Sequence, residues 1–508
     1  MKRAFLLFLI IAMLFTAGCS NYYVGNSNPL PTLNPALSEN KKPGDNTQDK
    51  RPMRQQATVG VVDIDTYFPL GTKNYELSKF LYLVYDPLVK MDSNYKVSFC
   101  LADEVYTTDG GITWTINIKN NVKWHNGDAF CVEDVIFTVN SIKTADTLYS
   151  HMVKDISEVK KISDTQLTIK LCEPDSTFPS KLIFPVVRNN SETDVFPCGT
   201  GMYKFSNVAE NGSYVFELNT KYYFQKAAIQ KLIFTSYGSE RELSESDSDF
   251  MIVQQANVLN SILPGKSSCL IQGNTICTLM PSDTVEALDV NIRKAVFNAL
   301  DIQAIVKYAI SGYAGAKMLP IAENTWFNQK DSSYYPDGFT ACTIDSLGYF
   351  SPISITICAD ENNREHVSVA KKCTEQLNQA GFIANYVTYK TPDELSTLKY
   401  SFIVKDIELV YSWDFSLAFA ENEILSYNIT AIENAYMTPN DTGVTDMASF
   451  EEYVKSQTKN IAESFYDNLP YIGIYSEYSA LLIDEDINGR TKITATAWDP
   501  LLGFENLY

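Results

Sequence analysis

The sequence predicts an α/β protein in which helices cover a mainly parallel sheet. Between residues 353 and 475, segments with the period of a strand alternate with segments that have the period of a helix. Such alternation is typical of parallel sheets covered by helices. The chain has 508 residues, of which 45% are hydrophobic. At about 150 residues per domain, this length predicts about three domains with ample cores.

The first 18 residues have the pattern of a signal peptide. Two basic residues precede an uninterrupted apolar run, Ala4 to Phe15. This run is too short to cross a bilayer of about 30 Å, and it fits the hydrophobic region of an export signal. Residues 16–19, T-A-G-C, resemble the bacterial lipobox, although Thr16 stands where Leu is usual. We expect cleavage after residue 18 and lipidation of Cys19, with ordinary secretory cleavage as the alternative.

The region that follows, residues 19–56, has the composition of a flexible tether. It is rich in Asn, Pro, Ser and Lys and has almost no apolar period, as in linkers that form no core. No later stretch is apolar for long enough to cross a membrane. We therefore expect a body that faces outside, at the extracellular surface or in the periplasm, held to the cell membrane by its lipid. The net charge of −20 opposes nucleic-acid binding, which needs basic patches.

The first half of the body alternates short strands with one clear helix. Glu133 and Asp134 occupy the first turn of that helix, where acidic side chains complement the helix dipole. Residues 239–249 are charged and serine-rich, which predicts a loop. The strands expected from alternating apolar residues are 113–118, a pair within 159–171 broken at Ser163-Asp164, 203–205, 215–218 and 232–234.

The second half carries the alternation of strands and helices. Residues 292–300 are expected to be helical, and Asp301 can cap a second helix that continues to Ile310 and ends at Gly312. A helix that ends at Gly381 has Val367, Ala370, Thr374 and Leu377 on one face. The further elements are a helix over 450–465 and strands over 353–358, 383–389, 402–404, 407–411 and 471–475.

The ten cysteines do not suggest a disulfide framework. Lipidation of Cys19 would leave an odd number, and none of them forms a C-x-x-C motif. Most lie in or beside apolar runs, so we expect reduced thiols that pack as small apolar side chains. Cys269 and Cys277 are the exception that we consider for pairing.

The search for catalytic residues is negative. His125, His151 and His366 do not pair at metal-ligand spacing, and no metalloprotease, nucleophile-elbow or phosphate-loop motif is present. Gly199-Thr200-Gly201 lacks the third glycine of a dinucleotide site and predicts a turn. We therefore expect no catalytic residues, no metal and no cofactor. The 31 Tyr, 27 Phe and 5 Trp instead suit a ligand cleft, because aromatic residues line many such clefts.

Several motifs occur in a fixed order. They are Y-D-P-L-V at 85–89, D-G-G-I-T-W-T at 109–115 followed by V-K-W-H-N-G at 122–127, the helix start at 130–137, G-T-G-M-Y at 199–203, V-N-I-R-K-A-V-F-N-A-L-D at 290–301 and L-P-Y-I-G-I-Y at 469–475. Together they resemble the family-5 extracellular solute-binding proteins, which serve ABC importers of peptides, nickel and related solutes. The resemblance runs from about Val59 to the C-terminus and weakens between Ser236 and Asp289.

This resemblance implies the two-lobe fold of type II periplasmic binding proteins, in which a hinge joins two α/β lobes and a third domain is inserted in the first. We expect lobe I to comprise residues 57–80, 196–285 and 480–508. The inserted domain is then 81–195, and lobe II is 286–479.

The resemblance also implies a ligand-binding strand. Residues 410–415, V-Y-S-W-D-F, are similar to the family's G-W-x-x-D-Y strand. In peptide-binding members, the Asp of this strand holds the ligand's ammonium group. Asp414 is thus the expected anchor, and Tyr411, Ser412 and Trp413 offer backbone hydrogen bonds. A register slip by one residue, or a solvated Asp at a strand end, is the alternative.

The implied function is that of a monomer that captures a solute, with a peptide as the leading ligand, and delivers it to the permease subunits of an ABC transporter. Nickel chelates, haem and oligosaccharides are the alternative ligands on the same fold. A surface receptor or adhesin that is not coupled to transport is the alternative of another class. The resemblance implies no enzyme.

Overall fold

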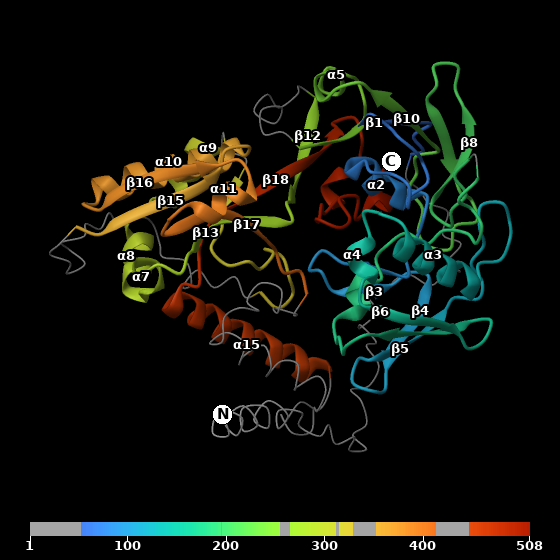
Figure 1. The fold of residues 1–508 in the computed structure, drawn as a ribbon. Helices are drawn as coiled ribbons and strands as arrows, with labels where there is room; N and C mark the ends of the chain where they lie inside the picture. Colours follow the sequence, from blue (N-terminus) through green and yellow to red (C-terminus); the bar gives the residue numbers. More distant parts are fainter. Residues whose placement is uncertain (1–51, 195, 255–264, 311–313, 329–351, 413–446) are drawn as a thin grey trace, which may run out of the picture.

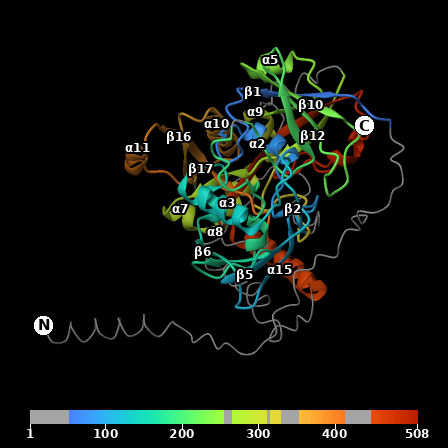
Figure 2. The same ribbon diagram turned by 90° about the vertical axis from the view of Figure 1, so that its right-hand side faces the viewer.

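The computed structural model describes residues 52–194, 196–254, 265–310, 314–328, 352–412 and 447–508. These residues form two α/β lobes side by side, and a small antiparallel sheet lies against the first lobe (Figures 1 and 2). Cys19, Trp413 and Asp414 lie outside the described residues, so the expected lipid anchor and ammonium anchor remain predictions.

One twelve-stranded sheet runs through both lobes. Its main order is β16-β15-β17-β13-β18-β11-β1-β10-β9-β8, and β12 and β14 also pair with β18. The strands of the first lobe are β1 (Ala57–Val62), β8 (Tyr203–Val208), β9 (Tyr214–Leu218), β10 (Lys231–Tyr237), β11 (Phe250–Val253) and β12 (Lys266–Gln272). Those of the second are β13 (Thr275–Pro281), β14 (Ala314–Ala316), β15 (Ser354–Asp360), β16 (Ile383–Tyr389) and β17 (Phe402–Glu408), and β18 (Ile472–Asp484) serves both.

The expectation of a mainly parallel sheet is wrong. Parallel pairing joins β1 to β10 and β11, and β15 to β16 and β17. The other pairs of this sheet are antiparallel, because β8, β9 and β10 follow one another through short connections and β18 runs against four neighbours. The alternation of strands and helices that suggested a parallel sheet is confined to β15, α10 (Arg364–Gln379), β16 and β17.

The strand β18 joins the two lobes. Its first residues pair with β13 and β14, and its last residues pair with β11 and β12. A second connection runs from β12 to β13 through Gly273 and Asn274. The chain therefore passes between the lobes in neighbouring segments, as a hinge requires. Because Cys277 and Leu279 of β13 belong to the core of the second lobe, we propose that this lobe begins near residue 275 rather than at 286.

Two other expectations need correction. The expected loop 239–249 contains the short helix α5 (Glu240–Ser244), whose first turn is capped by the Ser239 hydroxyl. The strand expected at 402–404 and the first residues of the one expected at 407–411 form the single strand β17, which ends at Glu408. The remaining helices of the second lobe are α7 (Val285–Leu288), α8 (Val290–Ala299), α9 (Ile302–Ala309), α11 (Pro392–Thr397) and α15 (Met447–Asn468).

The segment expected as an inserted domain has its own sheet. Strands β4 (Ala102–Thr107), β5 (Thr113–Ile118), β7 (Gln166–Leu171) and β6 (Ile156–Lys161) form it in the order β4-β5-β7-β6. Trp114 of β5 is fully buried and its indole nitrogen donates to the carbonyl of Gly111. The other elements here are β2 (Val89–Met91), β3 (Val97–Phe99), α3 (Val132–Thr144) and α4 (Ser150–Val153).

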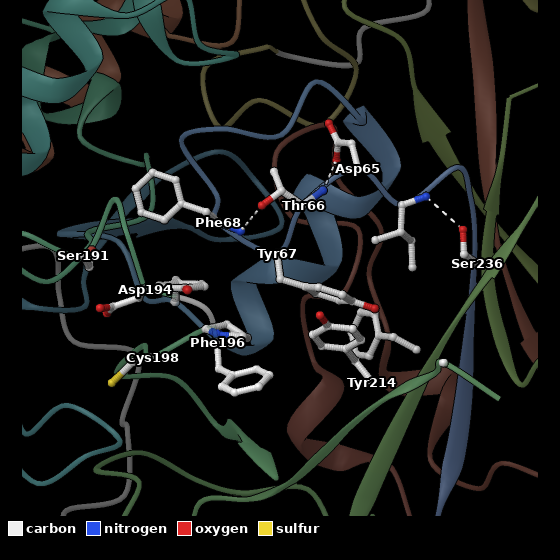
Figure 3. A pocket seen from close by; sticks show the side chains of 15 residues that line it. Asp65, Thr66, Tyr67, Phe68, Ser191, Asp194, Phe196, Cys198, Tyr214 and Ser236 are labelled. Carbon is white, nitrogen blue, oxygen red and sulfur yellow. Dashed lines mark hydrogen bonds between the residues drawn. The ribbon is translucent and has the colours of Figure 1, made fainter. Parts of the chain in front are cut away.

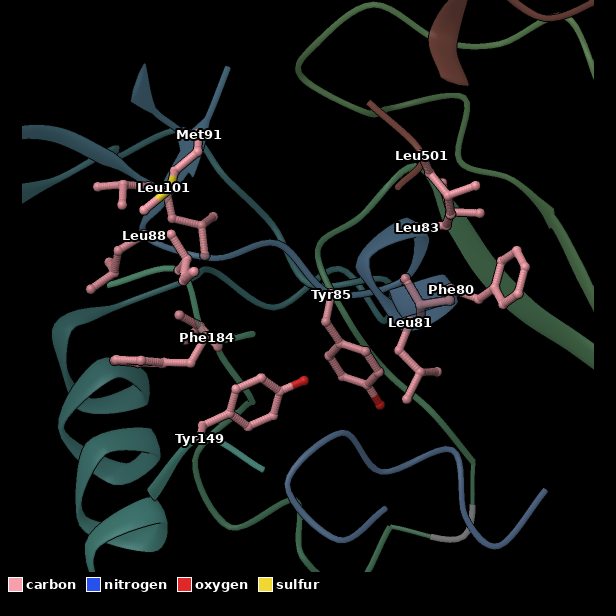
Figure 4. Close-up of a cluster of buried hydrophobic side chains, with 14 of the residues drawn as sticks. Phe80, Leu81, Leu83, Tyr85, Leu88, Met91, Leu101, Tyr149, Phe184 and Leu501 are labelled. Atoms are coloured by element: carbon pink, nitrogen blue, oxygen red, sulfur yellow. The ribbon is translucent and has the colours of Figure 1, made fainter. Parts of the chain in front are cut away.

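This small sheet packs on the first lobe through a shared apolar core. Figure 4 shows Phe80 and Leu81, where α2 (Tyr75–Phe80) ends, near Tyr85, with Leu88, Leu101 and Phe184 further along the same cluster. These side chains are almost fully buried. Because apolar burial contributes about 25 cal/mol per Å², this core holds the first lobe and the small sheet together.

The cysteines of the described part are free thiols. Cys100, Cys277, Cys358 and Cys373 are buried, whereas Cys131, Cys198 and Cys269 are half-buried and Cys172 is exposed, so the expectation of buried thiols holds for only some of them. Cys269 and Cys277, which we considered for pairing, are both free. In the part of the chain that the structure describes, no helix is both long and apolar enough for a membrane span.

Candidate functional site

A pocket of about 280 Å³ opens in the first lobe. It lies at the carboxyl ends of the parallel strands β1 and β10, the edge at which open α/β sheets bind their ligands. The loop after β1 forms one wall, and residues 191, 194 and 196–198, the start of β9 and the end of β10 form the others (Figure 3).

Aromatic rings form the interior of this pocket. Tyr67 stacks on Tyr214 with 4.2 Å between ring centroids, and it meets Phe234 edge-on at 5.9 Å. Phe196, another lining residue, stacks on Phe205 at 4.5 Å but is itself 47% exposed. Burial raises the pKa of the Tyr67 phenol far above its usual range, so this ring is neutral. Aromatic rings therefore form part of the pocket wall, although Tyr67 itself is only 8% exposed.

Two acidic residues, Asp65 and Asp194, also line the pocket. Asp65 accepts hydrogen bonds from the Thr66 and Lys73 amides, each at 2.7 Å, and from the Thr72 hydroxyl at 2.6 Å. Burial alone would raise the pKa of the Asp65 carboxyl, but these hydrogen bonds lower it below the usual value. Asp194 pairs with Arg188 at 2.9 Å. Among the described residues Asp65 has no ion-pair partner, so its carboxylate adds a negative charge to the pocket lining.

Tyr411 lies in another place, at the junction of the two lobes. Its ring is 7% exposed and packs on Tyr95 and Trp498, with 4.8 and 5.5 Å between centroids. Its hydroxyl donates to the carbonyl of Gly273 at 2.8 Å, in the connection between the lobes. The side chain of Tyr411 is thus part of the hinge. Ser412 follows it and is half-buried.

The structure does not bring the expected site residues together with the pocket. Tyr411 and Ser412 do not line it, and Trp413 and Asp414 lie outside the described residues. The sequence did not single out Asp65, Tyr67 or Tyr214. One signal could have found the first two, because they follow directly after a buried strand that opens the globular part of the chain.

Three histidines were expected to be structural or solvated. His125 is structural, since its Nδ1 accepts from the Gly199 amide at 3.1 Å and its Nε2 lies 3.0 Å from the Gly201 carbonyl. These bonds join two of the sequence motifs. His366 is buried and contacts Asp406.

The sequence and the fold match a known family. A family model described as "Bacterial extracellular solute-binding proteins, family 5 Middle" matches residues 96–421. The chain belongs to this family. Its members are solute-binding proteins that work outside the cytoplasm, and the family is not one of enzymes.

Individual relatives are distant. The glutathione-binding protein GsiB of Pectobacterium atrosepticum is 22% identical over 58% of this chain and 62% of its own length. The nickel-binding periplasmic protein of Escherichia coli is 26% identical over 45% of this chain and 46% of its own. The oligopeptide-binding protein AppA of Bacillus subtilis, solved with a nonapeptide, shares the fold with a TM-score of 0.57 at 16% identity, over 90% of this chain and 99% of that one. The matched segments span less than two thirds of these curated relatives.

Proposed function

We propose that this protein captures a small peptide outside the cytoplasm and delivers it to the permease subunits of an ABC transporter. Family membership supports solute capture, and relatives named for glutathione and oligopeptides favour a peptide. The observation that carries the choice of ligand is the pocket of the first lobe, which is lined by the ionised Asp65 and by aromatic residues.

The chemistry of this pocket suits one part of a peptide. Its volume of about 280 Å³ is at the lower end of ligand sites, which hold about 300–1,000 Å³, so it fits a side chain with its backbone unit. The faces of Tyr67 and Tyr214 attract cations as well as apolar groups. A basic or aromatic side chain, or the ammonium end of a peptide, would therefore meet favourable contacts here.

A second anchor is proposed at Asp414. The similarity of residues 410–415 to the family's peptide-binding strand motivates this assignment. Tyr411, Ser412 and Trp413 would then contribute through their backbone positions, and the engaged hydroxyl of Tyr411 is consistent with a side chain that does not contact the ligand. A carboxylate that meets an ammonium in a closed cleft forms a strong charge-assisted hydrogen bond.

The test is calorimetry with a free-amine tripeptide and its N-acetylated form. Charge-assisted hydrogen bonds contribute about 1.5–3 kcal/mol, or roughly 10- to 150-fold in affinity. Asp414→Asn should weaken binding of the free-amine peptide by this factor and barely change binding of the acetylated one. Asp65→Asn should weaken the binding of peptides that carry a basic side chain. Asp393→Asn, on the exposed face of α11, is the control and should bind like wild type.

Two results would contradict the proposal. If the wild-type protein binds no peptide but binds a nickel–histidine chelate tightly, the proposed ligand class is wrong. If peptides bind and Asp414→Asn has wild-type affinity, the proposed anchor or its register is wrong, although peptide capture itself is not contradicted.

The membrane anchor needs its own experiment. We propose that the processed protein is a lipoprotein attached through Cys19. Acyl chains on the terminal residue give stable anchoring, whereas a single chain binds only marginally. Cys19→Ala should release the protein into the medium or periplasm. A variant that stays with the membrane after a high-salt wash would exclude this anchor.

A further inference from the structure

A cysteine, a histidine and an aspartate meet in the second lobe, away from the pocket. Cys277 on β13 and Asp406 on β17 are directly opposite each other in antiparallel strands, so their side chains share one face of the sheet. His366, in the first turn of α10, lies over that face and its Nε2 is 3.2 Å from an Asp406 carboxylate oxygen. One ligand atom from each of the three residues lies within 4.8 Å of the others.

We propose that these three side chains form a zinc site. A thiolate, an imidazole and a carboxylate are the donor types that Zn²⁺ takes in proteins. With Zn–N and Zn–O of about 2.0–2.2 Å and Zn–S of about 2.3 Å, ligand atoms in a tetrahedral site are roughly 3.3–3.6 Å apart. The His366–Asp406 separation of 3.2 Å is close to this spacing. A shift of about 1 Å would bring the third atom within it.

Burial distinguishes this cluster from a chance meeting of surface groups. Cys277 is 2% exposed and His366 is 7% exposed. The Nδ1 of His366 is buried and has no hydrogen-bond partner within the described residues. A buried polar atom left unpaired is costly.

The cluster is partly open to solvent. The Asp406 side chain is 43% exposed, which leaves a path for the ion from solvent and room for water as the fourth ligand.

Binding must displace the thiol proton. Burial raises the pKa of the Cys277 thiol well above its usual value, so the free site holds the S–H form at neutral pH. On binding, the S–H bond breaks, the Zn–S bond forms and the proton leaves to the buffer. The Tyr475 hydroxyl, which hydrogen-bonds this sulfur, would continue to stabilise the thiolate.

The test uses the purified protein, reduced and stripped with a chelator. One equivalent of Co²⁺ should give a thiolate-to-cobalt charge-transfer band together with the visible bands of a tetrahedral site, and Zn²⁺ should abolish both. Elemental analysis should find one zinc per chain. Cys277→Ser should lose the charge-transfer band. Asp406→Asn, at an exposed position that leaves the fold intact, should weaken cobalt binding about tenfold or more, since even loss of an outer-sphere partner costs about 10–100-fold.

The matched control is Cys358→Ala, which removes another buried strand cysteine of the same lobe and should keep the band. Absence of a band in wild type would overturn the proposal, as would a band unchanged in both Cys277→Ser and Asp406→Asn. Because these residues do not line the pocket of the first lobe, peptide affinity should be the same in all three variants. Failure of the zinc site is thus separable from failure of peptide capture.

Discussion

The buried carboxylate of Asp86 offers the sharpest test of how the first lobe and the segment that carries the small sheet are held together. It belongs to the Y-D-P-L-V motif and is fully buried. It accepts from the hydroxyls of Tyr222 at 3.1 Å and Tyr223 at 2.8 Å, and from Thr200 at 3.3 Å, while the Lys90 ammonium lies 3.2 Å away. Four groups from three parts of the sequence therefore depend on one side chain.

Asp86→Ala should be strongly destabilising. Removing one partner of a buried ion pair lowers the free energy of unfolding by about 3–5 kcal/mol, because the other charge is left uncompensated. The three hydroxyl groups that donate to Asp86 would also lose their acceptor, which destabilises the folded state further. At a urea slope of about 3 kcal/mol per M, this loss lowers the unfolding midpoint by roughly 1–1.7 M.

The assay is urea unfolding followed by fluorescence of the aromatic residues. The control is Asp164→Ala, which breaks a surface pair with Lys161 in which the Asp164 side chain is 95% exposed. Exposed pairs contribute about 0–1 kcal/mol, so the midpoint should move by at most about 0.3 M. If Asp86→Ala moves the midpoint no further than Asp164→Ala, the buried network does not stabilise the lobe as we reason.

Three further predictions concern His125, Gly199 and the hinge. Burial lowers the pKa of His125 to about 4, so below about pH 6.5 the unfolded chain binds a proton at this ring and the folded chain does not. The free energy of unfolding should therefore fall by up to about 3 kcal/mol between pH 6.5 and 4. In His125→Asn this part of the pH profile should flatten, and an unchanged profile would refute the assignment. Gly199→Ala should destabilise the folded protein by about 1–3 kcal/mol or more, because the new Cβ would lie 1.8 Å from the Val84 carbonyl oxygen. The control is Gly71→Ala, whose Cβ would lie 3.4 Å from its nearest atom, and it should leave the thermal melt unchanged. Ligand that bridges both lobes should favour a closed state, so the radius of gyration from small-angle scattering should decrease at saturation, and an equal radius with and without bound ligand would count against hinge closure.

Local patterns in the sequence predicted most elements well. The helix expected to end at Gly381 is α10, capped at its start by Asn363, and the strand expected at 113–118 is β5. These elements have a clear period and clear end signals, so local information is sufficient. The helix α5 was missed although Ser239 and Glu242 have the spacing of a capping box, since five residues are too few to show a period.

Strand pairing could not be predicted in the same way. The direction of β18 relative to its neighbours depends on partners that lie more than 150 residues away along the chain. The strand expected to stop at Tyr475 continues to Asp484, because its second half pairs in the other lobe. The period of the sequence shows that a strand exists but does not identify its partner.

The candidate sites show the same limit. Tyr67 and Tyr214 meet in the pocket although about 150 residues separate them, and Cys277 meets His366 and Asp406 only through the sheet and α10. No spacing in the sequence indicates either group. The motifs that the sequence did reveal, Y-D-P-L-V and G-T-G, hold the first lobe together, since the Asp86 carboxylate and the Gly199 backbone are engaged in its packing.

Native mass spectrometry of the protein purified under mild conditions tests the central proposal, peptide capture, most directly. We predict an adduct of one peptide per chain, identified by fragmentation, which is present in wild type and in Asp393→Asn and depleted in Asp414→Asn. An adduct that fragments as a nickel chelate, a haem or a sugar oligomer would contradict peptide capture by this protein. A peptide adduct that is equally abundant on a control denatured and refolded without added ligand would contradict it as well.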